Sequence, residues 1–267
     1  MALRVIKADE RLAERRGIKI LVLGKAGIGK TWQVRTLPAE LTLVFEFEGG
    51  ELPLADWPGD LFRTRQWSEF CDVVVLLTGP NPALPASARF STAHYEHVRA
   101  NCEAPEAFER YRYVVIDSVT ALSRVCFTDC KSQPGAVSER SGRPDLRAAY
   151  GLLGQELLAA LNQLQHARHL HVVMTAILDE RLDEFNRRLF VPQIEGSKTA
   201  LELPGIVDEV VTLAELKADD GTSYRAFVTH TVNPFGFPAK DRSGRLEAVE
   251  PPHLGRLIQK CLGEGTP

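Results

Sequence analysis

The stretch GKAGIGKT, residues 24–31, decides the fold of this 267-residue chain. It fits the pattern G-x-x-x-x-G-K-[ST], in which glycines let backbone N–H groups close around phosphate groups. The run before it (18–24) reads as a strand, and the run after it (31–37) reads as a helix that stops at Pro38. This context predicts a phosphate-binding loop made of Gly24, Lys25, Ala26, Gly27, Ile28, Gly29, Lys30 and Thr31.

The residue types in the loop indicate a nucleoside triphosphate with its metal ion. Lys30 is expected to reach the β- and γ-phosphates, and the hydroxyl of Thr31 to bind Mg²⁺. The buried strand YVVIDS (113–118) ends in Asp117, which is where such proteins place a second ligand for Mg²⁺. ATP and Mg²⁺ are therefore the predicted cofactors. Ser118 has two open interpretations, as part of the metal shell or as the cap of the next helix.

Composition limits the other classes of function. The chain has 32 basic and 35 acidic residues, so any nucleic-acid contact must come from a local patch. Five cysteines without a C-x-x-C pair argue against a disulfide framework or a zinc site. The N-terminus lacks a signal-peptide pattern, and no apolar run approaches the roughly 20 residues that span a bilayer. We therefore expect a cytoplasmic protein without a membrane partner.

Strand-like and helix-like segments alternate, which predicts an α/β fold with a mostly parallel sheet flanked by helices. We expect a single domain over 1–267, with an N-terminal arm (1–17), an insertion (79–108) and a β-rich C-terminal extension with a terminal helix (207–267). The other predicted strands are 41–48, 111–117, 169–177, 207–216 and 223–232. The other predicted helices are 67–79, 146–167 and 255–262.

The segment VVIDSVTALSR (114–124) resembles the metal-binding strand of RecA-type recombinases. A polar loop, a long helix and a buried strand follow it in the order of that family, which implies a RecA-like P-loop ATPase core. FEFEGG (45–50) resembles the strand that delivers a glutamate to the attacking water. Glu48 is then the candidate general base, with Glu46 as its rival. A solvated strand end is the alternative for both.

A closer resemblance is to the phage-encoded RecA-like ATPases that anneal single strands, the fourth of the "Sak" types. It is carried by FEFEGG, by FSTAHYEHV (90–98), by PQIEGSKTALELPGIVDEV (192–210) and by a closing K-x-R-S-G. It implies a DNA-dependent ATPase that binds single-stranded DNA and promotes annealing or recombination in a bacterial host cytoplasm. It also implies a homo-oligomer, ring or filament, and a host single-strand-binding protein as partner. The chain departs from recombinases at Thr175 and Ala176, where an amide usually senses the γ-phosphate.

Lys240 and Arg242 belong to the segment FPAKDRSGRL (237–246). This segment resembles the K-x-R-x-G element of RecA-fold ring motors, in which both cations reach the nucleotide of a neighbouring subunit. The resemblance implies that Lys240 and Arg242 complete the catalytic site of the adjacent protomer. The alternative is a pair of solvated charges on a loop after Pro238.

Two arginine-bearing segments are candidates for contact with DNA phosphates. The first is the polar loop 131–147, with Arg140, Arg143 and Arg147. The second is the predicted hairpin 178–193, with Arg187 and Arg188 and two phenylalanines for base stacking. Acidic neighbours in the hairpin leave a polar solvated surface as the alternative.

Three other functions share a phosphate loop. A RecA-fold ring helicase would unwind duplex DNA, and a signalling ATPase would show no response to DNA. A small-molecule kinase needs a lid with several arginines, and the insertion 79–108 offers only Arg89 and Arg99. Of these three alternative functions, the sequence therefore favours the kinase least.

Overall fold

The structure is a computed structural model that describes residues 5–14, 16–138, 142–182 and 184–264. Its helices are α1 (Ala8–Ala13), α2 (Trp67–Thr78), α3 (Thr92–Asn101), α4 (Val119–Ser132), α5 (Leu146–His166), α6 (Ser197–Ile206) and α7 (Leu254–Leu262). Its strands are β1 (Lys19–Gly24), β2 (Thr42–Glu46), β3 (Asp60–Arg63), β4 (Tyr113–Asp117), β5 (His171–Leu182), β6 (Arg188–Pro192), β7 (Glu209–Lys217), β8 (Ser223–Val228), β9 (Lys240–Asp241) and β10 (Val249–Glu250).

The strands form one ten-stranded sheet in the order β10-β8-β7-β1-β5-β4-β2-β3, with β6 beside β5 and β9 beside β7. Every pair from β7 across to β3 is parallel, whereas β6, β8, β9 and β10 are antiparallel to their partners. The α/β class with a mostly parallel sheet is therefore confirmed. Strand β5 lies between β1, which carries the phosphate loop, and β4, which carries Asp117.

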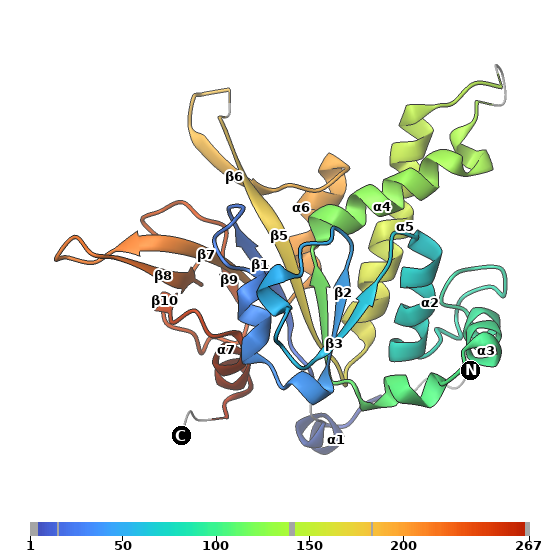
Figure 1. Ribbon diagram of the computed structural model, residues 1–267, viewed down its shortest axis with the longest axis horizontal. Coiled ribbons are helices and arrows are strands. Elements are labelled where there is room, and N and C mark those ends of the chain that lie inside the picture. Colours follow the sequence, from blue (N-terminus) through green and yellow to red (C-terminus); the bar gives the residue numbers. More distant parts are fainter. Residues whose placement is uncertain (1–4, 15, 139–141, 183, 265–267) are drawn as a thin grey trace.

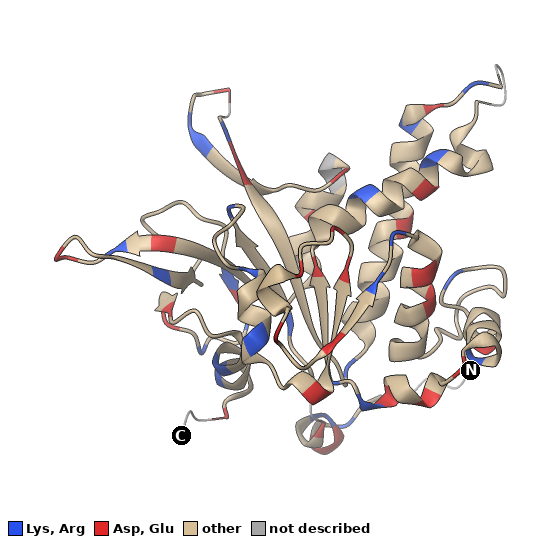
Figure 2. Ribbon diagram, in the orientation of Figure 1, with Lys and Arg blue, Asp and Glu red and all other residues tan. Residues whose placement is uncertain are grey.

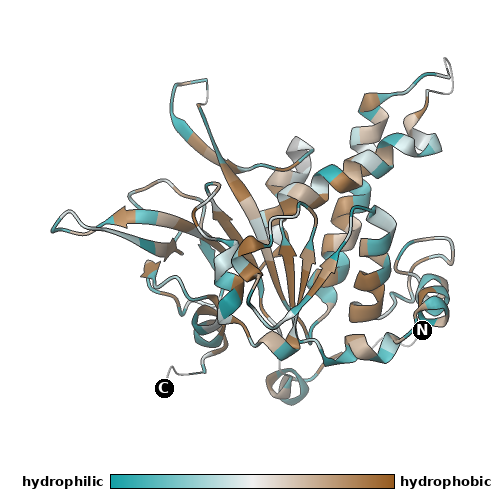
Figure 3. Cartoon of the chain, in the orientation of Figure 1, coloured by the Kyte–Doolittle hydropathy of each residue, from teal (hydrophilic) through white to brown (hydrophobic). Residues whose placement is uncertain are grey.

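Helices α2, α4 and α5 cover one face of this sheet, and α7 lies on the other (Figure 1). All six residues of β1 are buried, as expected for a parallel strand covered on both sides. Its side chains alternate between the two cores: Leu21 and Leu23 pack with the α2–α4–α5 side, and Ile20 and Val22 with the α7 side. The apolar colouring of the central strands in Figure 3 shows the same layer. This double burial fixes the strand ends that carry the site.

The helix expected after the phosphate loop is present as a 3₁₀ helix (Thr31–Thr36). Short segments favour 3₁₀ geometry, and Pro38 prevents extension. The hydroxyl of Thr36 also donates to the carbonyl of Gln33 at 2.7 Å, which competes with regular helix bonding. The short strand β3 and helix α6 were not predicted, because neither has a long periodic pattern.

The segment from residue 207 onward, expected as a β-rich extension, is continuous with the main sheet. Strand β7 pairs in parallel with β1, and β8 then returns beside β7 as an antiparallel hairpin. The terminal helix is present as α7. This tail therefore completes the sheet next to the phosphate loop and brings β8 within reach of it.

Two projections extend beyond the edge of the sheet where the parallel strands end (Figure 1). One is the connection from α4 to α5, and the other is the β5–β6 hairpin, which confirms the hairpin expected over 178–193. In the ribbon of Figure 2, basic and acidic residues alternate along both projections. The phosphate loop lies at the same edge, because it follows β1.

Candidate functional site

The phosphate loop joins β1 to the 3₁₀ helix and is closed around its own lysine. The amine of Lys30 donates to the carbonyls of Gly24 at 2.8 Å and Lys25 at 3.0 Å. Gly27 and Gly29 have φ of 77° and 105°, a region that side-chain-bearing residues rarely adopt. The two glycines therefore make the turn possible, and the loop has the shape that the motif predicts.

Thr31 and Asp117 meet across the sheet edge, as the motif requires. The hydroxyl of Thr31 donates to Oδ2 of Asp117 at 2.7 Å, and the hydroxyl of Thr175 donates to Oδ1 of the same carboxylate. These are oxygen donors, the type that Mg²⁺ prefers. The residues present therefore fit a bound Mg²⁺. Thr175, which stands where recombinases carry an amide, orients Asp117 instead.

Burial lowers the pKa of Lys30, and the negative charges of Asp117 and Glu48 oppose that shift. Desolvation disfavours a lone ammonium, so the site attracts an anion that would compensate the charge. A bound polyphosphate is such an anion. The two carboxylates that act on Lys30 are both residues that the sequence placed in the site.

Glu46 and Glu48 occupy different positions at the end of β2. Glu46 is buried beside Asp117 in the strand register, and its Oε1 accepts the backbone N–H groups of Glu48 at 2.8 Å and Gly50 at 2.9 Å. Glu48 lies beyond the strand with 45% of its side chain exposed, and it contacts Arg124 at 3.2 Å. Glu46 thus shapes the turn, whereas Glu48 is accessible to solvent near Lys30.

Ser118 caps helix α4, because its hydroxyl accepts the N–H of Ala121 at 3.2 Å. This is one of its two expected roles. Two other contacts at this edge have no signal in the sequence. Arg124 reaches Glu48 from the second turn of α4, and the hydroxyl of Thr120 accepts the N–H of Ile177 at 3.0 Å. Both contacts join segments that are far apart in the chain.

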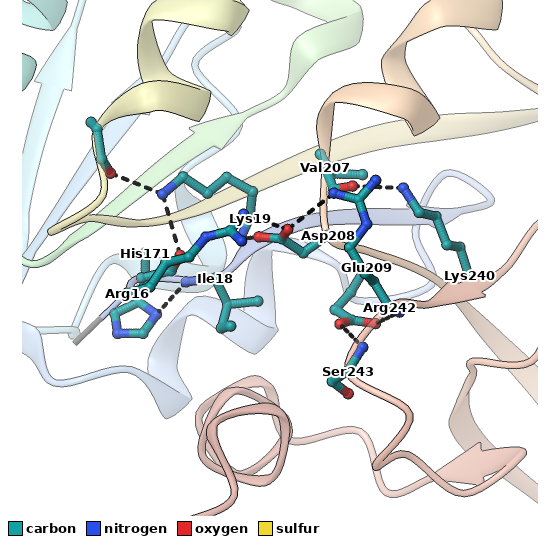
Figure 4. Close-up of polar contacts among 12 residues, drawn as sticks. Arg16, Ile18, Lys19, His171, Val207, Asp208, Glu209, Lys240, Arg242 and Ser243 are labelled. Atoms are coloured by element: carbon teal, nitrogen blue, oxygen red, sulfur yellow. Dashed lines mark hydrogen bonds and ion pairs between the residues drawn. The ribbon is translucent and has the colours of Figure 1, made fainter. Parts of the chain in front are cut away.

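Lys240 and Arg242 lie where β7 begins, at the other end of the parallel strands from the phosphate loop. Figure 4 shows the contacts of both residues. The amine of Lys240 donates to the carbonyls of Pro204 at 2.8 Å and Val207 at 2.7 Å, at the end of α6. Burial lowers the pKa of Lys240, and the nearby Arg242 acts in the same direction. The structure does not bring either residue to the phosphate loop of its own chain.

Arg242 is held less tightly than Lys240. Its guanidinium contacts Oδ1 of Asp208 at 3.3 Å, and 48% of its side chain is exposed. Asp208 also accepts the backbone N–H of Lys19 at 3.1 Å and the guanidinium of Arg16 at 2.7 Å, so this carboxylate has other partners (Figure 4). Arg242 is therefore the more accessible of the two predicted cations.

The candidate DNA residues are distributed over the two projections. Arg140 lies outside the described residues. Arg143 is exposed in the α4–α5 connection, and Arg147 is exposed in the first turn of α5. Arg187 and Arg188 are exposed on the β5–β6 hairpin, where the Arg187 guanidinium lies 5.0 Å from the ring of Phe185.

Two sizeable pockets lie among the described residues away from the phosphate loop. The larger, about 1100 Å³, lies between α5 and the segment 80–90. The smaller, about 700 Å³, is lined by residues of α5 and α6, including Arg147 and Tyr150. It therefore lies beside one of the candidate DNA residues.

Within the part of the chain that the structure describes, no helix has both the length and the apolar character needed to cross a membrane. No curated protein sequence matches this chain. One similar solved chain comes from a structural and biochemical analysis of a prototypical ATPase from the type III secretion system of pathogenic bacteria. The two share 15% identity with a TM-score of 0.37, over 74% of this chain and 51% of that one. This chain thus matches about half the length of that ATPase.

A family model described as an AAA domain matches residues 16–243. The match contains the phosphate loop, Asp117 and every parallel strand of the sheet. The RecA-like α/β ATPase core expected from the sequence is therefore confirmed. With most of its length inside this match, the chain belongs to the AAA domain family and is a P-loop ATPase.

Proposed function

We propose that this chain is a DNA-dependent ATPase that binds single-stranded DNA and promotes the annealing of complementary strands. The nucleotide part of the proposal is supported by the closed phosphate loop and by the contact of Thr31 with Asp117 at 2.7 Å. The DNA part is supported by the resemblance to annealing ATPases and by one set of contacts between the phosphate loop and the β5–β6 hairpin.

In this proposal the chain's own residues position ATP and the attacking water. Backbone N–H groups of the loop and the Lys30 ammonium bind the β- and γ-phosphates. Thr31 and Asp117 would hold Mg²⁺, which would neutralise negative charge on the phosphates. Glu48 accepts the proton of the attacking water, because it is accessible and already close enough to act on the charge of Lys30.

The observation that carries the DNA part is a pair of ionic contacts that share Glu180. In the phosphate loop, Lys25 lies 3.6 Å from Oε2 of Glu180, and on the hairpin Arg188 lies 3.3 Å from Oε1 of the same residue. A polyphosphate beside Lys25 or a DNA phosphate beside Arg188 would compete with this carboxylate. Because the two cations share one carboxylate, a phosphate bound at either of them changes the electrostatic environment of the other, and Glu180 thereby links the ATP site to the DNA site without the amide that recombinases use.

The α4–α5 projection adds a surface suited to single strands. Tyr150 on α5 is 44% exposed and stacks on Phe127 of α4, with ring centroids 4.3 Å apart. The amine of Lys131 lies 4.9 Å from the Phe127 ring, and Arg147 is one turn from Tyr150 on α5. Exposed aromatic faces with adjacent cations bind unpaired bases and their phosphates.

Replacing Arg143, which lies in the α4–α5 connection, tests whether this projection binds DNA. Arg143→Ala is expected to weaken single-stranded DNA binding and to reduce the slope of log affinity against log salt by about 0.7, because one fewer phosphate is neutralised. The double variant with Arg140→Ala should reduce it further. Fluorescence anisotropy with a labelled oligonucleotide at several salt concentrations measures both quantities. ATP affinity without DNA should not change, and an unchanged salt slope would remove this loop from the DNA site.

We further propose that Arg242 acts on the nucleotide of a neighbouring subunit in a ring or filament. Its guanidinium is half exposed and lies on the side of the sheet away from its own phosphate loop. Lys240, whose amine is bonded to two carbonyls of its own chain, would hold this segment in position. Such a cation neutralises charge that develops on the γ-phosphate during transfer.

Mixing two inactive variants tests this arrangement. Arg242→Ala keeps its phosphate loop but cannot complete its neighbour's site, and Lys30→Ala has a defective loop but an intact Arg242. Each protein alone should hydrolyse ATP slowly, and a mixture should regain part of the activity, because a mixed interface contains one complete site. Full activity of Arg242→Ala alone, or a mixture as inactive as its components, would contradict the arrangement.

A further inference from the structure

Two side chains outside the predicted site meet at Gly29 of the phosphate loop. Trp32 follows the loop directly, and Arg225 comes from β8, nearly two hundred residues later. The Nη1 atom of Arg225 lies 3.1 Å from the position that a Cβ on Gly29 would occupy, and the Cβ of Trp32 lies 4.0 Å from the same position. A guanidinium and the Cβ of a tryptophan therefore lie beside the place where the backbone would bind phosphate.

Arg225 has the features of a residue that could bind an anion. Its side chain is exposed, and within the described ranges no carboxylate lies at ion-pair distance from it. The β7–β8 pairing fixes its position, because Arg225 lies opposite Glu215 in a regular antiparallel ladder. A guanidinium beside a phosphate loop can donate two hydrogen bonds to one phosphate group.

Trp32 is exposed, yet its ring is held in place. It is 54% exposed, whereas the other two tryptophans of the chain, Trp57 and Trp67, are buried. The guanidinium of Arg35 lies 4.6 Å from the Trp32 ring centroid and is itself fixed by the Asp56 carboxylate, with one contact of 2.9 Å. An oriented aromatic ring with much of its surface exposed is a stacking partner for a base.

We propose that Trp32 and Arg225 bind the nucleoside end of the nucleotide. In this arrangement the Trp32 indole stacks on the base, and the Arg225 guanidinium binds the phosphate nearest the ribose. The inference rests on the proposed nucleotide-binding function and names the residues that would recognise the base and the phosphate nearest the ribose. Arg225 acts on the nucleotide of its own subunit, unlike Arg242.

Calorimetric titration with ATP and with inorganic tripolyphosphate separates the two roles. Trp32→Leu is expected to weaken ATP binding about tenfold, the scale of one base–aromatic stack, and to leave tripolyphosphate binding within about twofold of wild type. Trp32→Phe should retain most of the ATP affinity. Arg225→Ala should weaken both ligands by about tenfold or more, as for other hydrogen bonds to charged groups. Tyr224→Ala is the matched control, because its side chain leaves the opposite face of β8.

Tryptophan fluorescence gives a second measurement that does not depend on turnover. Iodide quenches exposed indoles, so ATP should protect the wild-type protein from quenching and should have no such effect on Trp32→Leu. Variants that bind both ligands as wild type does would overturn this inference and leave nucleotide binding intact. Equal loss of ATP and tripolyphosphate in Trp32→Leu would also overturn it. A wild-type protein that binds neither ligand would overturn the proposed function and this inference together.

Discussion

Replacing Lys30 with alanine is expected to abolish ATP turnover while the protein stays folded. The Lys30 amine is the cation at the centre of the loop, and a charge-assisted contact of this kind contributes about 10- to 100-fold to affinity. A phosphate loop without it cannot bind the γ-phosphate in the reacting position. Equilibrium binding of ATP and release of phosphate measure the two losses separately.

The fold should tolerate this change, because among the described residues the Lys30 amine donates only to two loop carbonyls, those of Gly24 and Lys25. Losing them costs about 1 kcal/mol, which lowers the melting temperature of a chain of this size by about 2–4 °C. Lys7→Ala, at an exposed lysine outside the loop, is the matched control and should behave as wild type. Hydrolysis by Lys30→Ala at the wild-type rate would show that the loop is not the catalytic phosphate site.

Glu48→Gln is expected to slow ATP hydrolysis by a factor of about 10² or more, the usual scale for losing a general base. ATP binding should remain, because the phosphate loop is intact. The amide has nearly the same shape as the carboxylate but cannot accept a proton from water. Single-turnover hydrolysis, compared with ATP affinity, distinguishes a chemical defect from a binding defect.

Two further variants test whether the effect of Glu48→Gln is due to Glu48 itself or to its neighbours. Glu46→Gln keeps an oxygen that can accept the N–H groups of Glu48 and Gly50, so its turnover should stay within a few-fold of wild type. Arg124→Ala removes the exposed ion pair with Glu48, which contributes little, and should have a similarly small effect. A severe defect in Glu46→Gln with normal Glu48→Gln would assign the base to Glu46.

The sequence predicted the parts of the site that are local in the chain. The loop 24–31 has a spacing that only one backbone shape satisfies, and the strand that ends in Asp117 follows from an apolar run and its last residue. Thr31 and Asp117 were both predicted to bind Mg²⁺, and their contact at one edge of the sheet agrees with that prediction. The fold class followed from the alternation of strands and helices.

The other contacts of the site join segments that are far apart in the chain. A local sequence pattern does not indicate which of these segments the fold brings together. Strand β8 returns beside the phosphate loop because the tail joins the main sheet, and this places Arg225 at Gly29. The ionic contact of Lys25 with Glu180 depends on the angle of the β5–β6 hairpin. The sequence of the hairpin alone is typical of a mixed polar loop. The type of the helix after the loop could not be predicted, because its six residues are too few to show a period.

The rate of ATP hydrolysis with and without single-stranded DNA tests the central claim most directly. The purified chain is assayed with Mg²⁺ and ATP alone, with an unstructured oligonucleotide, and with the same sequence as a duplex. The account predicts measurable turnover that rises about 5-fold or more with the single strand, the scale of the coupling typical of linked sites, and that rises less with the duplex. Turnover that is the same under all three conditions would contradict the claim that DNA controls this ATPase.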